Sequence, residues 1–127
     1  MDLNQVTVSC ADYDASVSFY KALGLRQIVD SPPRYARFES GNGATFSIHN
    51  SAVPVNSDFV IYFEVDDVDE TVDQLKGKGL AFDQEPLDQR WLWREARLRD
   101  PSGNAICIYH AGENRRYPPW RLQNDPA

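Results

Sequence analysis

The chain has 127 residues, enough for one domain with a hydrophobic core, and 42% of them are hydrophobic, as in globular rather than disordered proteins. Its net charge of −6 argues against a general nucleic-acid-binding protein, which normally presents a basic face. No apolar run is long enough to span a bilayer, and the N-terminus lacks the pattern of a secretory signal. We therefore expect a cytoplasmic protein that binds neither nucleic acid nor membranes.

The first half of the chain predicts a strand, a helix and three further strands. Apolar residues alternate with polar ones from Val6 to Cys10, which indicates a strand with one apolar face. Possible N-caps at 12–14 precede a helix predicted over Ala15–Leu23, and Gly24 is typical of its C-terminal end. The three strands are predicted over Leu25–Val29, Tyr35–Glu39 and Thr45–His49.

After a polar linker over Asn50–Asp58, the second half repeats this order. VSCADYDASVSFYKALGL in the first half matches FEVDDVDETVDQLKGKGL in the second. The elements predicted there are a strand over Phe59–Val65, a helix over Val68–Lys76, a weak strand over Leu80–Glu85 and a final hairpin of Trp91–Arg99 and Ala105–Tyr109. We therefore expect an α+β fold of two βαβββ modules, residues 1–54 and 55–110, whose mixed sheets form a cup with helices outside, followed by an extended tail at 111–127.

Three motifs in this order, SVSFYKALGL, VDDVDETVDQLKGKG and RDPSGNAICIY, resemble the vicinal oxygen chelate superfamily. That superfamily includes glyoxalase I, extradiol dioxygenases, fosfomycin-resistance enzymes and bleomycin-resistance proteins. The resemblance covers Leu3 to Tyr109 and implies a cavity inside the cupped sheets. It also implies a homodimer, because family members of this size complete their cavities across subunits. One such fold hosts many activities, so the motifs do not indicate a particular reaction.

The resemblance also implies where a metal ion would bind. In the metal enzymes of the superfamily the ligands are His, Glu, His and Glu or near variants, at positions that correspond here to Gln5, Ser47, Val60 and Cys107. Gln5 alone matches, since Val60 has no donor atom, Ser47 is a poor ligand and Cys107 would have to be a thiolate. We therefore expect no metal cofactor, and no catalytic residue is assigned. In character the chain is closest to the metal-free bleomycin-resistance proteins, in which a planar cationic drug lies in a cleft between subunits.

The face of the predicted sheets opposite the core is mixed in chemistry and is where we expect a small molecule to bind. Aromatic rings there suit planar or cationic ligands, and polar groups would anchor them. The candidate ligand-binding residues are His49, Tyr62, Glu64, Trp91, Trp93, Glu95, Arg97, Cys107 and Tyr109. Each also has a structural interpretation: a solvated sheet face, a histidine hydrogen-bonded at the rim, a buried ion network, an inert thiol, and tryptophans that pack the hairpin and the tail.

Two other functions stay open at this point. The first is a metal-dependent lyase, isomerase or dioxygenase that uses an altered ligand set of Gln5, His49 and Glu64. The second is an interaction module whose cup is filled by its own side chains or by the tail. The tail carries three arginines around Tyr117 and Trp120, and we expect it to lie across a subunit surface, its own or its partner's. The two cysteines are predicted to be free thiols on opposite faces of the sheets, and His110, with core-side parity, is given no role.

Overall fold

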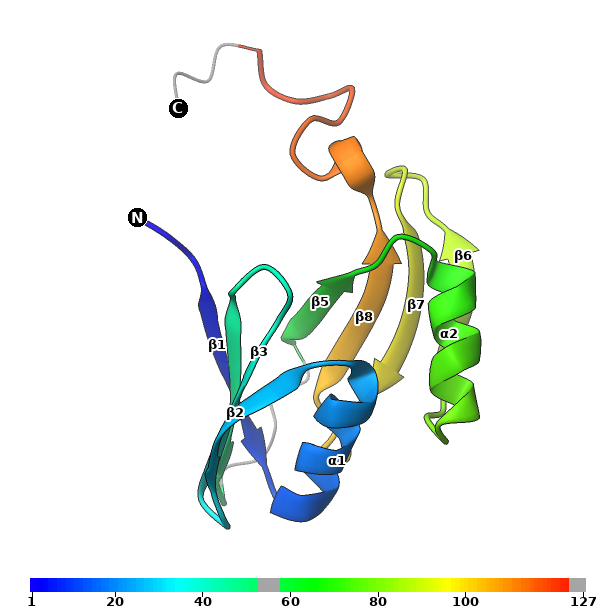
Figure 1. Cartoon of the computed structure of the whole chain (residues 1–127). Helices are drawn as coiled ribbons and strands as arrows, with labels where there is room; N and C mark the ends of the chain where they lie inside the picture. Colours follow the sequence, from blue (N-terminus) through cyan, green and yellow to red (C-terminus); the bar gives the residue numbers. More distant parts are fainter. Residues whose placement is uncertain (53–57, 124–127) are drawn as a thin grey trace.

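The computed structural model describes residues 1–52 and 58–123 (Figure 1). Within these residues the chain forms two four-stranded mixed sheets and two α-helices, which confirms the predicted α+β fold. The strand order β1-β4-β3-β2 of sheet A recurs as β5-β8-β7-β6 in sheet B. The repeat in the sequence is therefore a repeat of topology. The expected module boundary between residues 54 and 55, and most of the predicted linker, lie outside the described residues.

Sheet A and helix α1 follow the predicted order. The elements are β1 (Gln5–Cys10), α1 (Tyr13–Leu23), β2 (Arg26–Ser31), β3 (Tyr35–Glu39) and β4 (Thr45–Asn50). Strand β1 pairs parallel with β4, and β4, β3 and β2 pair antiparallel. Helix α1 begins two residues earlier than predicted, because the Asp12 carboxylate accepts the Ala15 N–H at 3.1 Å and Tyr13 is buried. It ends at Gly24, whose φ of 113° lies in the left-handed region that favours glycine.

Sheet B differs from the prediction in two places. Its elements are β5 (Val60–Glu64), α2 (Val68–Gly77), β6 (Gln84–Asp88), β7 (Arg94–Arg99) and β8 (Ala105–His110). The weak strand predicted from residue 80 begins only at 84, because Leu80 and Phe82 pack against the core from a loop. Strand β7 starts at 94 instead of 91, because Leu92 has φ 70° in a turn closed by a hydrogen bond from Gln89 N to Trp93 O of 2.7 Å.

The core joins the two modules. Each sheet has an apolar face against its helix, with Tyr20 of α1 and the predicted α2 stripe of Val68, Val72 and Leu75 all buried. Figure 1 shows α2 against sheet B and α1 in the space between the two sheets. The Tyr20 ring lies 4.4 Å from that of Phe46, and its hydroxyl donates to Asp100 at 2.6 Å in the β7–β8 turn. No helix of the described residues covers the opposite face of either sheet, and we call these the open faces of sheets A and B.

The end of the chain extends beyond sheet B. After β8 a short 3-10 turn covers Gly112–Asn114, and the described residues that follow contain neither helix nor strand (Figure 1). Tyr117, Trp120 and Leu122 are exposed there. His110 has the expected core-side parity as the last residue of β8, opposite Arg94, but it is exposed at this end of the sheet, and its Nδ1 is bound to the Val65 carbonyl at 2.8 Å. None of the helices in the described part of the chain has the length and apolar character needed to cross a membrane.

Candidate functional site: the open faces of the two sheets

Three aromatic rings gather on the open face of sheet B, contributed by β5, β8 and the residue before β7. Trp93 and Tyr109 are stacked, with ring centroids 4.8 Å apart and planes 28° apart. Tyr62 stands edge-on to both, at 6.0 Å and 5.5 Å. Tyr62 is 45% exposed and Tyr109 is buried. The Tyr62 ring is therefore accessible to a ligand, while the buried Tyr109 ring supports it from below. We call these three residues the aromatic cluster.

A buried ion pair lies beside the aromatic cluster. The Glu95 side chain is 2% exposed, and its two oxygens accept hydrogen bonds from Trp91 Nε1 and Arg97 Nη2, each of 2.9 Å. The Arg97 guanidinium in turn lies 5.7 Å from the centroid of the Tyr62 ring. The carboxylate therefore has the partners that a buried charge requires, and it holds both Trp91 and Arg97 in place at the open face.

Cys107 lies under this face and is chemically quiet. It is fully buried and packs with Tyr109, Val60 and Trp93. Burial, reinforced by Glu95 and only partly opposed by Arg97, raises the pKa of the Cys107 thiol to about 12. The group is therefore a protonated thiol at neutral pH and not a thiolate. Cys10 is also free and buried on the core side, which confirms that the two cysteines lie on opposite faces.

Of the nine candidate residues, seven lie together on the open face of sheet B: Tyr62, Trp91, Trp93, Glu95, Arg97, Cys107 and Tyr109. Glu64 lies at the end of the same face and binds the start of the tail, accepting the N–H groups of Ala111 and Gly112 at 2.7 Å and 2.9 Å. His49 is not part of this group. It is exposed at the end of β4 in sheet A, opposite Ser9 and Tyr35.

The open face of sheet A holds a polar network that sequence reasoning missed. Gln5 Nε2 donates to Ser47 Oγ at 2.8 Å, and Ser47 Oγ lies 2.6 Å from Tyr35 Oη. Arg37 Nε donates to the same Tyr35 oxygen at 2.8 Å. The signal was present in the alternation of Tyr35 and Arg37 with buried residues along β3, since period two puts both side chains on the open face.

The positions of the family's metal ligands do not fit a metal ion in this chain. Gln5 and Ser47 belong to the sheet A network, in which the Ser47 hydroxyl is already bound on both sides. Val60 and Cys107 belong to sheet B, where one has no donor atom and the other is a protonated thiol. Zinc and related ions need deprotonated or basic ligands, so this donor set supports no metal-dependent step.

The altered ligand set is not brought together either. His49 lies opposite Ser9, four residues along the sheet from the pair of Gln5 and Thr45, a separation of about 13 Å. Glu64 is in the other sheet, where the start of the tail occupies it. Across residues 1–52 and 58–123, no three His, Cys, Asp or Glu side chains form a cluster that could hold a metal ion.

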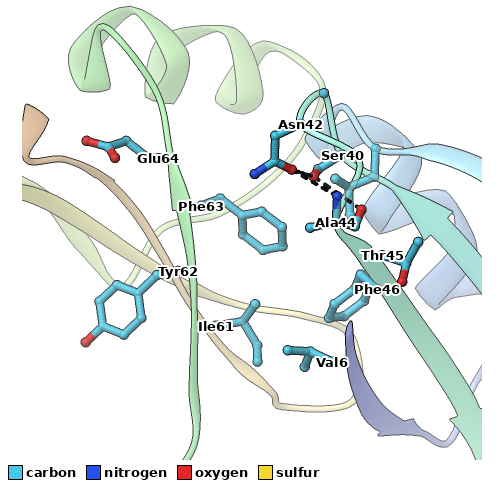
Figure 2. A pocket seen from close by; sticks show the side chains of 12 residues that line it. Val6, Ser40, Asn42, Ala44, Thr45, Phe46, Ile61, Tyr62, Phe63 and Glu64 are labelled. Carbon is cyan, nitrogen blue, oxygen red and sulfur yellow. Dashed lines mark hydrogen bonds between the residues drawn. The ribbon is translucent and has the colours of Figure 1, made fainter. Parts of the chain in front are cut away.

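A pocket opens between the edges of the two sheets. It has a volume of about 460 Å³, and Figure 2 shows the side chains of Val6, Phe46, Ile61 and Phe63 directed into it. Tyr62, although its atoms contribute to the wall, points to the other side of β5. The pocket is therefore on the apolar side of the sheets and separate from both open faces. Sequence reasoning missed it because these residues have the parity of core positions.

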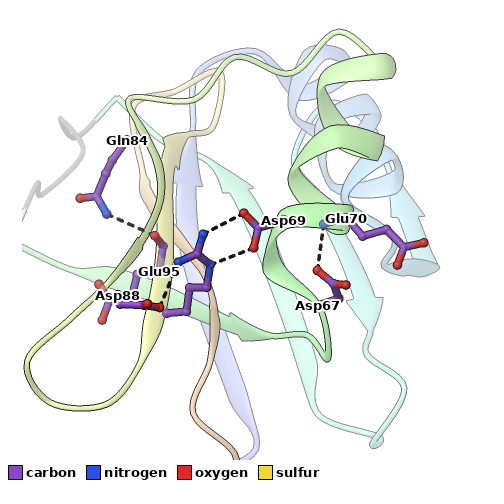
Figure 3. A network of polar contacts seen from close by, with 7 residues as sticks. Asp67, Asp69, Glu70, Gln84, Asp88 and Glu95 are labelled. Carbon is purple, nitrogen blue, oxygen red and sulfur yellow. Dashed lines mark hydrogen bonds and ion pairs between the residues drawn. The ribbon is translucent and has the colours of Figure 1, made fainter.

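A polar network behind the site fixes the hairpin that carries Trp91 and Glu95. Arg94 donates to both carboxylate oxygens of Asp69 in α2, at 2.8 Å and 2.9 Å, and to Asp88 of β6 at 3.0 Å. Figure 3 shows these carboxylates converging between the helix and the two strands. The hydrogen bonds from Arg94 hold the pKa of Asp69 below its usual range. Sheet B and its helix therefore give the aromatic cluster a rigid support.

The comparisons with known proteins agree with this architecture. A family model described as the Glyoxalase/Bleomycin resistance protein/Dioxygenase superfamily matches residues 2–108. The chain is 32% identical over 125 residues to the uncharacterized protein YraH of Bacillus subtilis (strain 168), covering 86% of this chain and 98% of YraH.

Two solved structures show the same fold. One is a glyoxalase/bleomycin resistance protein/dioxygenase from Nocardioides, with a TM-score of 0.77 and 20% identity, covering 97% of this chain and 90% of that one. The other is a lactoylglutathione lyase from Agrobacterium tumefaciens, with a TM-score of 0.71 and 17% identity, covering 86% and 92%. At these identities the structural matches establish the fold alone.

Proposed function

The chain belongs to the glyoxalase/bleomycin resistance protein/dioxygenase superfamily, and from this premise we propose that it binds and sequesters an organic small molecule without a metal ion. The binding surface is the open face of sheet B. The ligand stacks its planar part on the aromatic cluster, and Arg97, held in place by the buried Glu95, anchors its polar groups. Binding without turnover is the activity, in the manner of a bleomycin-resistance protein.

One observation carries this proposal: an aromatic cluster with one exposed ring, Tyr62, stands beside the Glu95–Arg97 ion pair on the open face of sheet B. Tyr62 is 45% exposed and packs on two rings that are themselves held in place. Large aromatic surface together with a few fixed polar groups is the usual composition of a small-molecule site. The protonated Cys107 and apolar Val60 beneath it supply packing and no chemistry, which favours binding over catalysis.

We also propose that the protein is a homodimer whose subunits complete the cup for each other. Among the described strands β1 and β5 are both sheet edges, so each can make further contacts on one side. Within residues 1–52 and 58–123 no hydrogen bond joins the open-face side chains of sheet A to those of sheet B. A second copy that places its sheet A opposite this sheet B would enclose the aromatic cluster.

The first experiment is elemental mass spectrometry on protein purified without a His-tag or chelator and then challenged with Ni²⁺, Zn²⁺, Fe²⁺ and Mn²⁺. We expect no tightly held metal, because the donor set does not fit one. About one metal per subunit would overturn the metal-free proposal. It would favour the metal-dependent lyase, isomerase or dioxygenase instead.

The second experiment tests the binding surface through tryptophan fluorescence. Metal-free bleomycin and a panel of planar aromatic compounds are titrated into the wild type, Tyr62→Ala and Trp120→Phe. We expect a planar compound to quench the fluorescence of the wild type and of the tail control Trp120→Phe, and to bind at least about 10-fold more weakly to Tyr62→Ala. Equal affinity for all three proteins would overturn the assignment of the ligand to the aromatic cluster.

A further inference from the structure

The internal repeat places one arginine in each module at the same position of its sheet. Arg37 of β3 lies opposite Ser47 of β4, and Arg97 of β7 lies opposite Cys107 of β8. The strands read YAR and EAR at these points, with the alanine buried on the apolar face in both. Each arginine therefore occupies the equivalent place on the open face of its sheet.

The two arginines differ in what compensates their charge. Arg97 is bound to the Glu95 carboxylate at 2.9 Å. In sheet A the residue equivalent to Glu95 is Tyr35, which is a phenol and not a carboxylate. In the part of the chain that the structure describes, no carboxylate forms an ion pair with Arg37, although its side chain is half-buried. Partly buried cations normally have such partners. The Arg37 guanidinium lies 5.4 Å from the centroid of the Tyr35 ring, but no carboxylate in the described residues neutralises its charge.

The hydrogen bonds around Arg37 leave several donor groups without an acceptor in the described residues. Ser47 is fully buried, accepts a hydrogen bond from Gln5, and lies 2.6 Å from Tyr35 Oη in a contact in which either hydroxyl can donate. Arg37 Nε donates to the same Tyr35 oxygen at 2.8 Å. With Ser47 as the donor, which satisfies its buried proton, Tyr35 accepts two hydrogen bonds and its own O–H is left to donate. The terminal nitrogens of Arg37 have no protein acceptor among residues 1–52 and 58–123.

The other charged groups on this face do not neutralise the positive charge of Arg37. Glu39, at the end of β3, lies 3.9 Å from Arg26, and His49 lies opposite Tyr35. Burial acts to raise the pKa of Tyr35, but the hydrogen bonds from Ser47 and Arg37, together with the Arg37 charge, outweigh it and lower the pKa. A more acidic phenol is a stronger hydrogen-bond donor. The open face of sheet A thus carries a local positive charge at Arg37.

We propose that Arg37 and Tyr35 form an oxyanion-binding site on the open face of sheet A, which takes the carboxylate or phosphate group of a small molecule. The planar guanidinium edge matches two oxygens of such a group, and the Tyr35 hydroxyl supplies a further donor. The site is built from sheet A alone. This proposal is therefore independent of the aromatic cluster and of the function proposed for that cluster.

The test is isothermal titration calorimetry with benzoate, phenyl phosphate and the neutral analogue benzamide. The proteins are the wild type, Arg37→Gln, Tyr35→Phe and Arg90→Gln. The last removes an exposed arginine of the β6–β7 turn that forms no ion pair with the residues the structure describes. We expect at least one anion to bind the wild type and Arg90→Gln, and benzamide not to bind. Arg37→Gln should weaken binding at least about 10-fold, the loss of roughly one charge-assisted hydrogen bond, and Tyr35→Phe by a smaller factor.

The relative affinity of benzoate and phenyl phosphate then identifies the source of the oxyanion. Binding of benzamide as tight as that of benzoate, binding of neither anion, or full affinity in Arg37→Gln would each overturn the proposal. Thermal melting shows whether the variants are folded. Spectrophotometric titration of tyrosine is a second measure, since the pKa of Tyr35 should rise in Arg37→Gln. All three tryptophans lie between residues 91 and 120, so tryptophan fluorescence tests the sheet B site separately.

Discussion

Replacing Tyr20 by phenylalanine tests the contact that locks the two modules together. The Tyr20 side chain is completely buried, and its hydroxyl donates to Asp100 Oδ2 at 2.6 Å. The same oxygen also accepts from Asn104 Nδ2 at 2.7 Å, so the carboxylate keeps a partner in Tyr20→Phe. The ring and its packing are unchanged in this variant. The substitution therefore removes one hydrogen bond to a buried charge and little else.

A hydrogen bond to a charged group contributes roughly 1.5–3 kcal/mol, and the remaining Asn104 bond moves the expected loss to about 2 kcal/mol. For a domain of this size that corresponds to a fall in Tm of about 8 °C. The loss should also depend on pH. Burial and the Asp100 charge raise the pKa of Tyr20 above its ordinary 10.0, so above that pH the unfolded chain loses a proton that the folded chain keeps. The stability that Tyr20 contributes is therefore present below pH 10 and is lost as the pH rises.

Urea denaturation and thermal melting of the wild type, Tyr20→Phe and Tyr117→Phe would measure these quantities. Tyr117 is 56% exposed in the tail, so its substitution is the matched control and should change the free energy of unfolding by less than about 0.5 kcal/mol. The stability gap between the wild type and Tyr20→Phe should narrow above pH 10. A Tyr20→Phe protein as stable as the wild type at pH 7 would refute the reasoning that this hydrogen bond holds the modules.

Three further predictions concern single sites. Asp67→Ala removes the cap on the Glu70 N–H, so urea denaturation should show a loss of about 1 kcal/mol with an unchanged m-value. Gly24→Ala should destabilise the fold by about 1 kcal/mol, because the backbone φ of 113° there favours glycine. Gly77→Ala, at a helical position with open space around it, should stabilise the fold by about 0.5–1 kcal/mol. Equal shifts in Tm for the two variants would contradict this. Cys107 in the native protein should react with iodoacetamide at pH 8.5 at least about 100-fold more slowly than in guanidinium, because burial raises the pKa of its thiol from 9.0 to about 12. The stability that the buried thiol contributes is present below pH 9 and is lost as the pH rises toward 12. Comparable labelling rates in the two states would contradict the burial.

The candidate site shows how much of a binding surface can be predicted from strand parity in the sequence. Alternation along β5, β7 and β8 placed Tyr62, Glu95, Arg97 and Tyr109 on one face, and the structure has them there. The same reasoning did not single out Tyr35 and Arg37, because neither matches a position that the family uses for metal ligands. Trp91 was assigned to a strand and lies in a turn, since one residue with positive φ ends the alternation that parity depends on.

The periodicity of apolar residues, together with the capping and turn residues, predicted the helices and strands, their duplication and the chemical difference between the two faces of each sheet. A helix stripe, a capping aspartate or an alternating strand is a local property, so the residues nearby determine it. Contacts between residues far apart in the sequence are not local properties of this kind. The Tyr20–Asp100 hydrogen bond joins residues 80 positions apart. No motif predicts that Arg37 lacks a carboxylate partner among the described residues, because this depends on which side chains the folded sheet places next to it. Packing of segments distant in sequence decided those contacts, because only the folded sheets bring Tyr20 to Asp100 and bring Ser47 to Tyr35.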